Sequence, residues 1–366
     1  GFVGITYPVR PGDTDAINEC RLAGVDVKVV TGDTSVTAKE ICRQIGLCND
    51  DKESGLISGE EFAALSDSHA ASVIPNLRVM YRARPADKLK LVRLLQEMGE
   101  VVAVTGDGTN DAPALNKANV GLAMGSGTSV AKEASDIILL DDSFTSIVNA
   151  IRWGRSLYQN IQRFLFFQLT INLLALAIVL FGPLVGVTLP LTVVQMLWVN
   201  LIMDTFAALA LATEPPHKEV MKQKPRKATD FIITLQMQRW IGISAVSFFV
   251  VLVVFLRLLK ANNGITVYEL TLFFNVFVML QFWNLFNAKA MGSGKSALSN
   301  MGKSKSFLVI AALIFLGQVL IVQFGNNFFR TTPLTLYHWF LIFLSTSIVL
   351  WVGELFRFVN RRKGRE

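Results

Sequence analysis

The chain has 366 residues, of which 52% are hydrophobic and 17% charged, and its formal net charge is +7 at pH 7. A basic chain can indicate a nucleic-acid-binding protein, but this apolar content argues against that class and favours a membrane protein with basic cytoplasmic flanks. The three cysteines, Cys20, Cys42 and Cys48, have no regular spacing, which predicts reduced thiols and neither a disulfide framework nor a metal site. The sequence begins within a strand pattern and without an initiating methionine, so we expect a fragment of a longer protein.

Residues 1–145 alternate short apolar segments with helical patterns, which predicts a parallel sheet with helical crossovers. The expected strands are residues 2–6, 25–30, 77–81, 101–104 and 120–124. The expected helices are residues 13–22, 37–45, 86–98 and 112–118. Ser58 and Glu61 have the spacing of a capping box for one more short helix. We therefore expect an α/β domain in this part of the chain.

Polar side chains follow two of the expected strands. Thr31 and Asp33 follow the second strand, and Asp107 and Asp111 lie in the segment TGDGTNDAPAL after the fourth. Lys88 stands near the start of the helix that precedes this fourth strand. Because open α/β sheets bind ligands beyond the carboxyl ends of their strands, we expect these groups to meet around a phosphoryl group and its Mg²⁺.

In such a site Thr31 would donate to a phosphate oxygen, Lys88 would neutralise the phosphate and Asp107 would hold the metal. Taken singly, each motif has a simpler interpretation: a turn at a strand end, a solvated lysine, or an ordinary strand–turn–helix connection. The sequence contains no Asp-Lys-Thr-Gly segment to supply the nucleophilic carboxylate that covalent phosphoryl transfer requires. We therefore expect the chain alone to be inactive.

From Ser146 onwards the sequence contains six apolar segments long enough to cross a bilayer. They lie at about residues 164–182, 191–212, 240–259, 270–287, 307–325 and 339–358, and the first continues a helical pattern that begins near Ile147. The connections after the second and fourth segments, and the C-terminal tail, are rich in lysine and arginine, whereas each of the other connections holds one such residue or none. By the positive-inside rule the soluble domain, the basic connections and the C-terminus are cytoplasmic. We therefore expect a soluble domain over residues 1–145 and a multi-pass membrane domain over residues 146–366.

Few polar groups lie within the expected spans. Asp204 lies in the second span, Asn200 precedes it by four residues on the same helix face, and Asn172 lies in the first span. An intramembrane ionisable residue usually marks an ion or proton pathway, and oxygen ligands from Asn and Asp suit a hard cation such as Ca²⁺. Alternatively, Asp204 pairs with one of these asparagines and only holds helices together. Gln281 and Asn284 in the fourth span either join the ion site or form hydrogen bonds within the core.

Four segments resemble the P-type cation-transporting ATPases, specifically the plasma-membrane-type Ca²⁺-transporting ATPases. They are VVTGDTSVTAKEICRQIGL, RPADKLKLV, TGDGTNDAPALNKANVGLAMGSGTSVAKEASDIILLDDSF and LWVNLIMDTFAALALATEPP. The third segment is highly specific to P-type pumps, and the fourth narrows the resemblance to Ca²⁺ pumps and their close relatives. The resemblance covers essentially the whole chain. It implies an incomplete haloacid dehalogenase-like phosphorylation domain with a parallel sheet, followed by an all-α bundle of six transmembrane helices.

The resemblance also implies site residues in both domains. Around an aspartyl-phosphate and Mg²⁺ it places Thr31, Gly32, Asp33, Lys88, Asp107, Asn110 and Asp111, with Asp107 as the Mg²⁺ ligand and Lys88 as the phosphate-binding lysine. Arg82 would support the nucleotide phosphates. In the membrane the resemblance assigns Asn172, Asn200 and Asp204 to the transported Ca²⁺, with Gln281 as a further candidate ligand. Ala175 and Met203, together with this glutamine, replace residues of pumps with two Ca²⁺ sites, which implies one Ca²⁺ per cycle.

The resemblance further implies which parts precede Gly1: the actuator domain, the nucleotide-binding domain, the nucleophilic aspartate and the first four spans. Tyr7 stands before Pro8 where the family usually has an aspartate. The leading hypothesis is the C-terminal portion of an ATP-driven pump that couples formation and hydrolysis of an aspartyl-phosphate to Ca²⁺ export. Its partners would be the bilayer, ATP and the missing N-terminal portion. The alternatives are a pump for Mn²⁺ or H⁺, or a non-catalytic membrane fragment.

Overall fold

The computed structural model describes residues 12–48, 55–187, 189–216, 218–227, 229–260, 265–299, 301–302 and 304–363. The strand expected at residues 2–6 and the position of Tyr7 lie outside these residues. The chain divides into two compact units. Unit 1 comprises Gly1–Arg155 and Lys218–Asp230, and unit 2 comprises Ser156–His217 and Phe231–Glu366.

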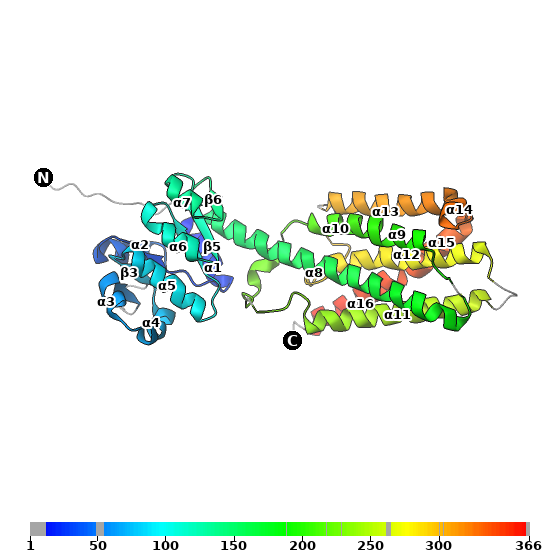
Figure 1. The fold of residues 1–366 in the computed structure, drawn as a ribbon, viewed down its shortest axis with the longest axis horizontal. Helices are drawn as coiled ribbons and strands as arrows, with labels where there is room; N and C mark the ends of the chain where they lie inside the picture. The colour runs from blue at the N-terminus through cyan, green and yellow to red at the C-terminus, as the bar shows by residue number, and fades with distance from the viewer. Residues whose placement is uncertain are drawn as a thin grey trace. The chain divides into compact units, whose positions relative to one another are not determined.

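Unit 1 is an α/β unit built from short strands and short helices (Figure 1). Its strands are β1 (Val29–Val30), β2 (Leu56–Ser58), β3 (Val79–Tyr81), β4 (Ala103–Gly106), β5 (Val120–Met124) and β6 (Ile137–Leu139). Its helices are α1 (Asp13–Leu22), α2 (Ser35–Gln44), α3 (Gly59–Ala64), α4 (Asp67–Val73), η1 (Ile74–Asn76), α5 (Pro85–Glu97), η2 (Thr109–Asp111), α6 (Ala112–Lys117), α7 (Ser129–Glu133) and η5 (Lys218–Lys222).

The strands pair in parallel, as expected, but they form two sheets of three strands where we expected one. The orders are β1-β3-β2 and β4-β5-β6, with Val29 opposite Val79 in the first sheet and Ala103 opposite Val120 in the second. β1 and β4 each stand at the edge of their sheet, and no strand among the described residues pairs with both. The polar groups that follow β1 and β4 therefore follow two separate edges.

Two cysteines form a disulfide, so the prediction that all three thiols are reduced was wrong. Cys42 in α2 is bonded to Cys48, and Cys20 remains a buried free thiol. The physical reason is the turn after α2, where Gly46 has φ +73° and the backbone N–H groups of Leu47 and Cys48 both donate to the carbonyl oxygen of Cys42. This turn brings the Cα atoms of Cys42 and Cys48 to 5.3 Å from each other, a distance at which a disulfide can form. The spacing of the cysteines along the sequence did not indicate this turn.

A basic connection of the sequence folds as part of unit 1. Val220 and Met221 of η5 are buried against α1, in a cluster that also contains Val148. The Arg155 guanidinium donates to the carbonyl oxygens of Gln223 and Ala23, each at 2.8 Å. Residues 218–230 therefore belong to unit 1 although they connect two membrane helices in the sequence.

Unit 2 is entirely helical. Its elements are the part of α8 (Phe144–Phe181) from Ser156 onwards, η3 (Gly182–Val185), α9 (Val193–Leu197), the π-helical segment η4 (Trp198–Met203), α10 (Asp204–Ala212), α11 (Leu235–Lys260), α12 (Val267–Ala290), α13 (Lys305–Phe324), α14 (Asn326–Phe329), α15 (Leu336–Thr346) and α16 (Ile348–Lys363). α8 is one continuous helix of 38 residues, as the sequence predicted.

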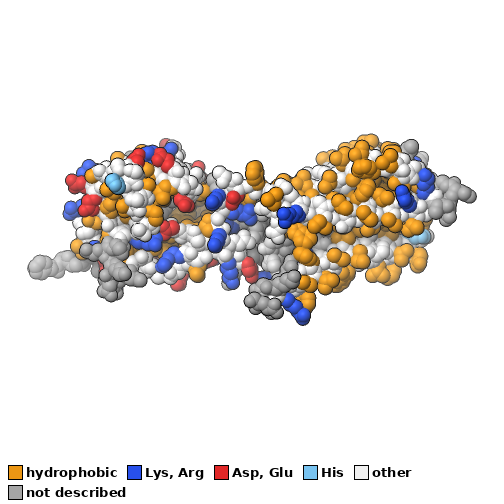
Figure 2. Space-filling view, turned by 90° about the horizontal axis from the view of Figure 1, so that it is seen from below, with side chains coloured by type: hydrophobic (Ala, Val, Ile, Leu, Met, Phe, Trp, Pro, Cys, Tyr) orange, Lys and Arg blue, Asp and Glu red, His pale blue; other side chains and the backbone are white. Residues whose placement is uncertain are grey.

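Six helices in the described residues are long and apolar enough to cross a membrane, which is the number expected. They are Phe144–Val185, Val193–Ala212, Leu235–Lys260, Val267–Ala290, Lys305–Phe324 and Leu336–Val359. Figure 2 shows hydrophobic side chains over most of the visible face of this helical unit. Large apolar residues exposed in such numbers are the surface that lipid covers in an integral membrane protein.

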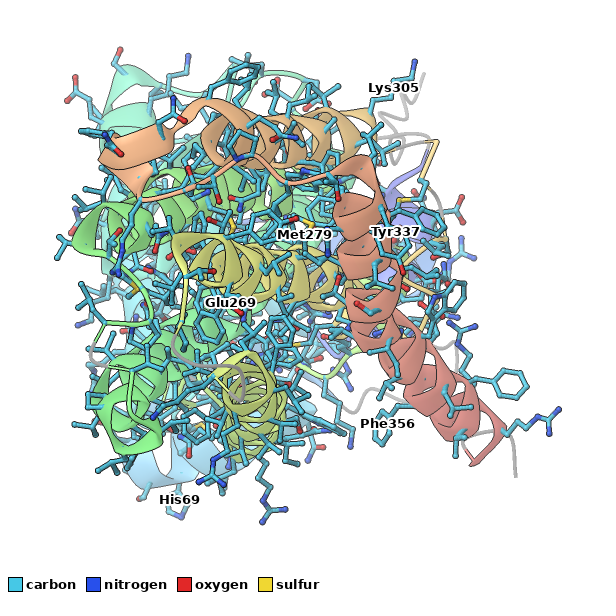
Figure 3. The ribbon with its side chains drawn as sticks, turned by 90° about the vertical axis from the view of Figure 1, so that its right-hand side faces the viewer. His69, Glu269, Met279, Lys305, Tyr337 and Phe356 are labelled. Carbon is cyan, nitrogen blue, oxygen red and sulfur yellow. A yellow bond between two sulfur atoms is a disulfide. The ribbon has the colours of Figure 1, made fainter. Side chains whose placement is uncertain are left out.

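The most polar of these helices is also the most buried. α12 has the lowest mean hydropathy of the six, yet 83% of its most apolar stretch is buried. Figure 3 shows this helix, marked by Glu269 and Met279, in the middle of the bundle. Its polar side chains Asn275, Gln281 and Asn284 are all buried. Asn275 accepts a hydrogen bond from Gln318 of α13 at 3.2 Å, and the Asn284 amide donates to Gln281 within α12 itself at 3.5 Å. A central position keeps these amides away from lipid, in which they would be costly.

A buried charge cluster, which we call the Arg163 cluster, joins the ends of several helices of unit 2. It comprises Asn160, Arg163, Glu214, Lys289 and Ser304, all with 7% or less of their surface exposed. Arg163 donates to the Asn160 side chain and to the Met291 carbonyl oxygen, each at 3.0 Å. Glu214 accepts from the Ser304 hydroxyl at 3.1 Å and lies 3.5 Å from the Lys289 ammonium. Sequence reasoning missed this cluster.

The capping box predicted from Ser58 and Glu61 is confirmed at the start of α3 and gives a testable prediction. The Ser58 backbone N–H and hydroxyl donate to the Glu61 carboxylate and hold its pKa below the usual value of 4.5. A lowered pKa means that the stabilisation is fully present above pH 4.5 and is lost as the pH falls through the lowered value.

We expect Ser58→Ala to lower the opening free energy of α3 by about 1 kcal/mol at pH 7, because the Glu61 N–H loses its acceptor. We also expect acidification below pH 4.5 to reduce the protection of α3 in the unmodified chain. Amide hydrogen exchange at the two pH values, corrected for intrinsic rates, measures both effects. Ser72→Ala, at an exposed position within α4 that caps no helix, is the control and should change protection by less than about 0.5 kcal/mol. Equal effects of the two substitutions would contradict the capping role.

Candidate functional site

The first part of the candidate phosphate site is the turn Thr31-Gly32-Asp33 after β1. The Thr31 hydroxyl donates to the Asp33 carboxylate at 2.7 Å and accepts from the Asp33 backbone N–H at 3.1 Å. The turn is fixed to the segment after β3, because the Ala83 and Arg82 N–H groups donate to the carbonyl oxygens of Thr31 and Asp33, each at 2.9 Å. Arg82 itself is exposed and has φ +49°, an uncommon backbone conformation for a residue other than glycine. The turn therefore presents a hydroxyl and a carboxylate on a well-fixed backbone.

The second part is the turn after β4, which is built around the carboxylate of Asp111. Asp111 is 9% exposed, and its Oδ1 lies 2.6 Å from the Lys88 ammonium at the start of α5. Its Oδ2 accepts from the backbone N–H groups of Asp107 and Gly108 at 3.3 and 3.2 Å. A Cβ atom at Gly106 would lie only 2.5 Å from the Asp111 Cβ, so the turn closes over Asp111 only because residue 106 is glycine. Lys88 and Asp111 are thus brought together, as the sequence reasoning expected.

The Asp107 carboxylate remains available to a ligand. It is exposed, and within the described part of the chain no hydrogen bond or ion pair of this carboxylate is found, whereas its backbone carbonyl oxygen accepts from the Thr128 N–H at 2.8 Å. Asn110 is exposed in the adjacent η2. Among the described residues no three His, Cys, Asp or Glu side chains form a metal-ligand group. Mg²⁺ needs only one or two carboxylates and completes its shell with phosphate and water oxygens, so Asp107 fits this metal.

The two parts of the candidate phosphate site are not bonded to each other within the described residues. No hydrogen bond or ion pair there joins Thr31 or Asp33 to Lys88, Asp107 or Asp111. The strands that precede the two turns, β1 and β4, stand at the edges of different sheets.

The candidate ion site in unit 2 centres on Asp204, the first residue of α10. Asp204 is 4% exposed, and neither of its carboxylate oxygens has a hydrogen-bond partner in the described part of the chain. A buried carboxylate without a partner is costly, and in native structures it usually marks a functional group or an ion site. The alternative that Asp204 pairs with Asn172 or Asn200 to hold helices together has no support in the geometry.

The other candidate ligands have different surroundings. Asn172 in α8 and Asn200 in η4 are exposed, and neither forms a hydrogen bond with Asp204 among the described residues. Gln281 in α12 is fully buried, its Oε1 lies 3.5 Å from the Asn284 amide, and its Nε2 has no partner in the described region. Asn200 lies within η4, and Asp204 follows directly after it, so the geometry of η4 determines how these two side chains are placed relative to each other. The π-helical geometry was not predicted, since Trp198–Met203 contains neither proline nor glycine to indicate an irregular turn.

Comparison with known proteins defines the family. Residues 188–359 match the family model "Cation transporting ATPase, C-terminus", and residues 2–119 and 89–151 match two models of haloacid dehalogenase-like hydrolases. The chain belongs to the cation-transporting ATPases. The haloacid dehalogenase-like unit and the helical unit that the sequence predicted are thereby confirmed.

Three relatives show how much of such an ATPase the chain represents. It is 42% identical over 366 residues to calcium-transporting ATPase 12, plasma membrane-type, from Arabidopsis thaliana, with 98% of the chain and 35% of the relative covered. It is 44% identical over 364 residues to calcium-transporting ATPase 4, plasma membrane-type, from the same plant, with the same shares covered. It is 44% identical to probable calcium-transporting ATPase 8, plasma membrane-type, from Oryza sativa subsp. japonica, with 97% of the chain and 35% of the relative covered. The chain therefore spans about a third of the length of these cation-transporting ATPases.

The tight packing of Gly106 against Asp111 gives a second prediction. We expect Gly106→Ala to displace Asp111 from Lys88 and to destabilise the chain by about 1–3 kcal/mol, since the added methyl group has no room. Gly154→Ala in α8 is the matched control, because a Cβ there meets no atom within 4 Å. It should be neutral or stabilising by up to about 1 kcal/mol, because alanine favours a helix over glycine.

Denaturant unfolding of the detergent-solubilised chain measures the overall effect of these substitutions, and hydrogen exchange at residues 107–111 locates it. Gly106→Ala should increase exchange in this turn, whereas Gly154→Ala should leave it unchanged. If both variants behaved as the unmodified chain does, the close packing around Asp111 would be wrong.

Proposed function

We propose that the chain acts as the C-terminal part of an ATP-driven Ca²⁺ pump. The observation that supports this most directly is Asp204, a buried and unpartnered carboxylate within a membrane-spanning helix. The same chain carries a turn suited to Mg²⁺ and phosphate at Lys88, Asp107 and Asp111. A phosphate site and an intramembrane cation ligand in one polypeptide are the two functional parts that an ion-motive ATPase needs.

In the phosphate site each residue of the chain has a distinct role. Lys88 would neutralise charge on the transferred phosphoryl group, and Thr31 with the Gly32 N–H would donate to its oxygens. Asp111 would hold Lys88 in place, and Asp107, assisted by Asn110, would hold Mg²⁺. Mg²⁺, when bound, would stabilise the negative charge that develops on the phosphoryl oxygens. Arg82 would orient the nucleotide phosphates. Asp33 would orient the Thr31 turn, to which it is hydrogen-bonded.

The nucleophilic aspartate would come from a preceding segment of the complete pump. The unpaired edges of β1 and β4 support this proposal, because a parallel strand placed between them would join the two sheets and bring both turns to one edge. ATP binding would likewise require that preceding segment. The carboxyl end of the added strand would place its aspartate between Thr31 and Lys88.

In the membrane, Asp204 would bind the transported Ca²⁺ together with Asn172 and Asn200, and with Gln281 as a further candidate. Ala175 and Met203 offer no ligand oxygen in their side chains, and both are buried, which supports a single Ca²⁺ site. Asn172 and Asn200 are exposed in this chain, as expected of ligands that complete their site with helices of the preceding portion. α8 carries Asn172 and runs unbroken from Phe144, so it is suited to transmit movement between the two functional parts.

The orientation follows from the charges of the connections. Unit 1, the basic connections after α10 and α12, and the C-terminus would be cytoplasmic by the positive-inside rule. Export would then carry Ca²⁺ from the side of ATP hydrolysis to the opposite side of the membrane.

Replacing Asp204 tests the ion site. In the complete pump we expect Asp204→Asn to abolish Ca²⁺-dependent phosphoenzyme formation, because the proposed site loses the negative charge of its carboxylate ligand. Asp230→Asn, the same change at an exposed position, should leave phosphoenzyme formation unchanged. Normal Ca²⁺ dependence of the Asp204→Asn pump would refute the assignment. Repeating the assay of the unmodified pump with Mn²⁺, and over a range of pH without added metal, separates a Ca²⁺ pump from a Mn²⁺ or H⁺ pump.

The chain by itself should not be phosphorylated. Incubation of the 366-residue chain with radiolabelled ATP and Mg²⁺ should give no acid-stable, hydroxylamine-sensitive label, because the nucleophile is absent from its sequence. Such a label on the chain alone would show that one of its own carboxylates is the nucleophile.

A further inference from the structure

The segment that carries the candidate ion ligands has an unusual helical geometry. η4, Trp198–Met203, is π-helical, and it lies directly before Asp204 and contains Asn200. A π-helical turn holds one residue more than an α-helical turn, so its conversion to α-helix would turn the residues on either side by about 100°, the rotation per residue. The direction of the Asp204 carboxylate therefore depends on whether this turn is kept.

The first residue of η4 is anchored to α13. Trp198 is 7% exposed, and its indole N–H donates to the Gln318 side-chain oxygen at 2.9 Å. Its ring lies over Gly317, where a Cβ atom would come within 2.5 Å of the ring carbon Cη2. Any larger residue at position 317 would push the rigid indole away, so the contact is specific for glycine.

The hydrogen bond of Trp198 also fixes the amide groups beyond it. An indole can only donate, so the Gln318 oxygen must face it and the Gln318 NH₂ group must point away. That NH₂ group donates to the Asn275 side-chain oxygen of α12 at 3.2 Å, and both amide side chains are fully buried. α13 is therefore held to the central helix of the bundle, and Trp198 is attached to a rigid support.

We propose that Trp198 is a positioning residue, which holds η4 in its π-helical form through Gly317 and Gln318 and thereby sets the direction of Asp204 in the ion site. This proposal rests on the proposed role of Asp204 in Ca²⁺ binding. It assigns to α13, which carries none of the candidate ligands, an effect on ion affinity.

The test uses the complete pump and two substitutions that each remove the Trp198–Gln318 hydrogen bond, although Trp198→Phe also reduces the ring that lies over Gly317 and Gln318→Met also removes the bond to Asn275. Trp198→Phe keeps an aromatic ring without the N–H group, and Gln318→Met keeps the side-chain length without the amide. Each should raise the Ca²⁺ concentration for half-maximal phosphoenzyme formation by about fivefold or more, the effect of leaving a buried polar group unpaired. The double variant should show less than the sum of the two single effects, because both substitutions remove the same Trp198–Gln318 bond.

Two controls separate positioning from general damage to the protein. Gln323→Met changes another glutamine of α13, which is bonded to the backbone of Leu334, and should shift the Ca²⁺ dependence by less than about twofold. Labelling by inorganic phosphate without Ca²⁺, the reverse of the hydrolysis step, should remain normal in every variant, since it does not require the ion site.

Unchanged Ca²⁺ dependence of Trp198→Phe, additive effects in the double variant, or an equal shift in Gln323→Met would overturn the proposal. If Gln318→Met does not fold, Gly317→Ala, which adds a Cβ at the ring, replaces it in the comparison with Trp198→Phe. Both variants should then raise the Ca²⁺ concentration for half-maximal phosphoenzyme formation. If Asp204→Asn abolished Ca²⁺-dependent phosphoenzyme formation while Trp198→Phe left it unchanged, the positioning role of Trp198 would be refuted and the ion site would stand. Normal Ca²⁺ dependence of Asp204→Asn would instead refute the ion site itself.

Discussion

The buried guanidinium of Arg163 is the constraint on which the helical unit depends most. A fully buried arginine is costly unless its donors find acceptors within the protein, and Arg163 is only 1% exposed. Its Nε and Nη1 groups have acceptors, whereas its Nη2 group has none among the described residues. The acceptors come from different parts of the chain: Asn160 one turn away on α8, and the Met291 carbonyl beyond the end of α12. Asn160 in turn donates to the carbonyl oxygen of Glu214, beyond the end of α10. These hydrogen bonds therefore join the interior of α8 to the chain just beyond the ends of α10 and α12.

The same principle explains why the polar helix is central. α12 would be a poor lipid-facing helix, because Asn275, Gln281 and Asn284 would be costly in hydrocarbon. Surrounded by other helices it forms the centre of the core, and Asn275 accepts a hydrogen bond from Gln318 of α13. The low hydropathy of this segment was visible in the sequence, but its position in the bundle was not.

The sequence predicted those features that depend on neighbouring residues along the chain. The capping box at Ser58 and Glu61, the continuous helix α8 and the six apolar helices all follow from local spacing and composition. The meeting of Lys88 with Asp111 followed from the general rule that ligands bind at the carboxyl ends of parallel strands.

Features that depend on distant parts of the chain could not be predicted. The division of the strands into two sheets depends on which distant strands pair with one another, and the local pattern of each strand does not contain that information. The Cys42–Cys48 disulfide depends on the turn at Gly46, and the Arg163 cluster on the packing of helices far apart in the chain. Asp204 was predicted as an ion ligand because it is a carboxylate within an apolar segment. That its carboxylate has no hydrogen-bond partner among the described residues could be learned only from the structure.

The membership of residues 218–230 in unit 1 has a consequence for any attempt to separate the two units. The polypeptide passes from one unit to the other three times, after Arg155, before Lys218 and after Asp230. A protease that cuts only after Arg155 leaves the first segment of unit 1 attached to the rest of the chain by packing alone, because residues 218–230 stay in the polypeptide of unit 2. Releasing the α/β unit as an intact body would require three cuts, and the short piece at 218–230 would then be retained only by its packing on α1 and by the hydrogen bonds of Arg155.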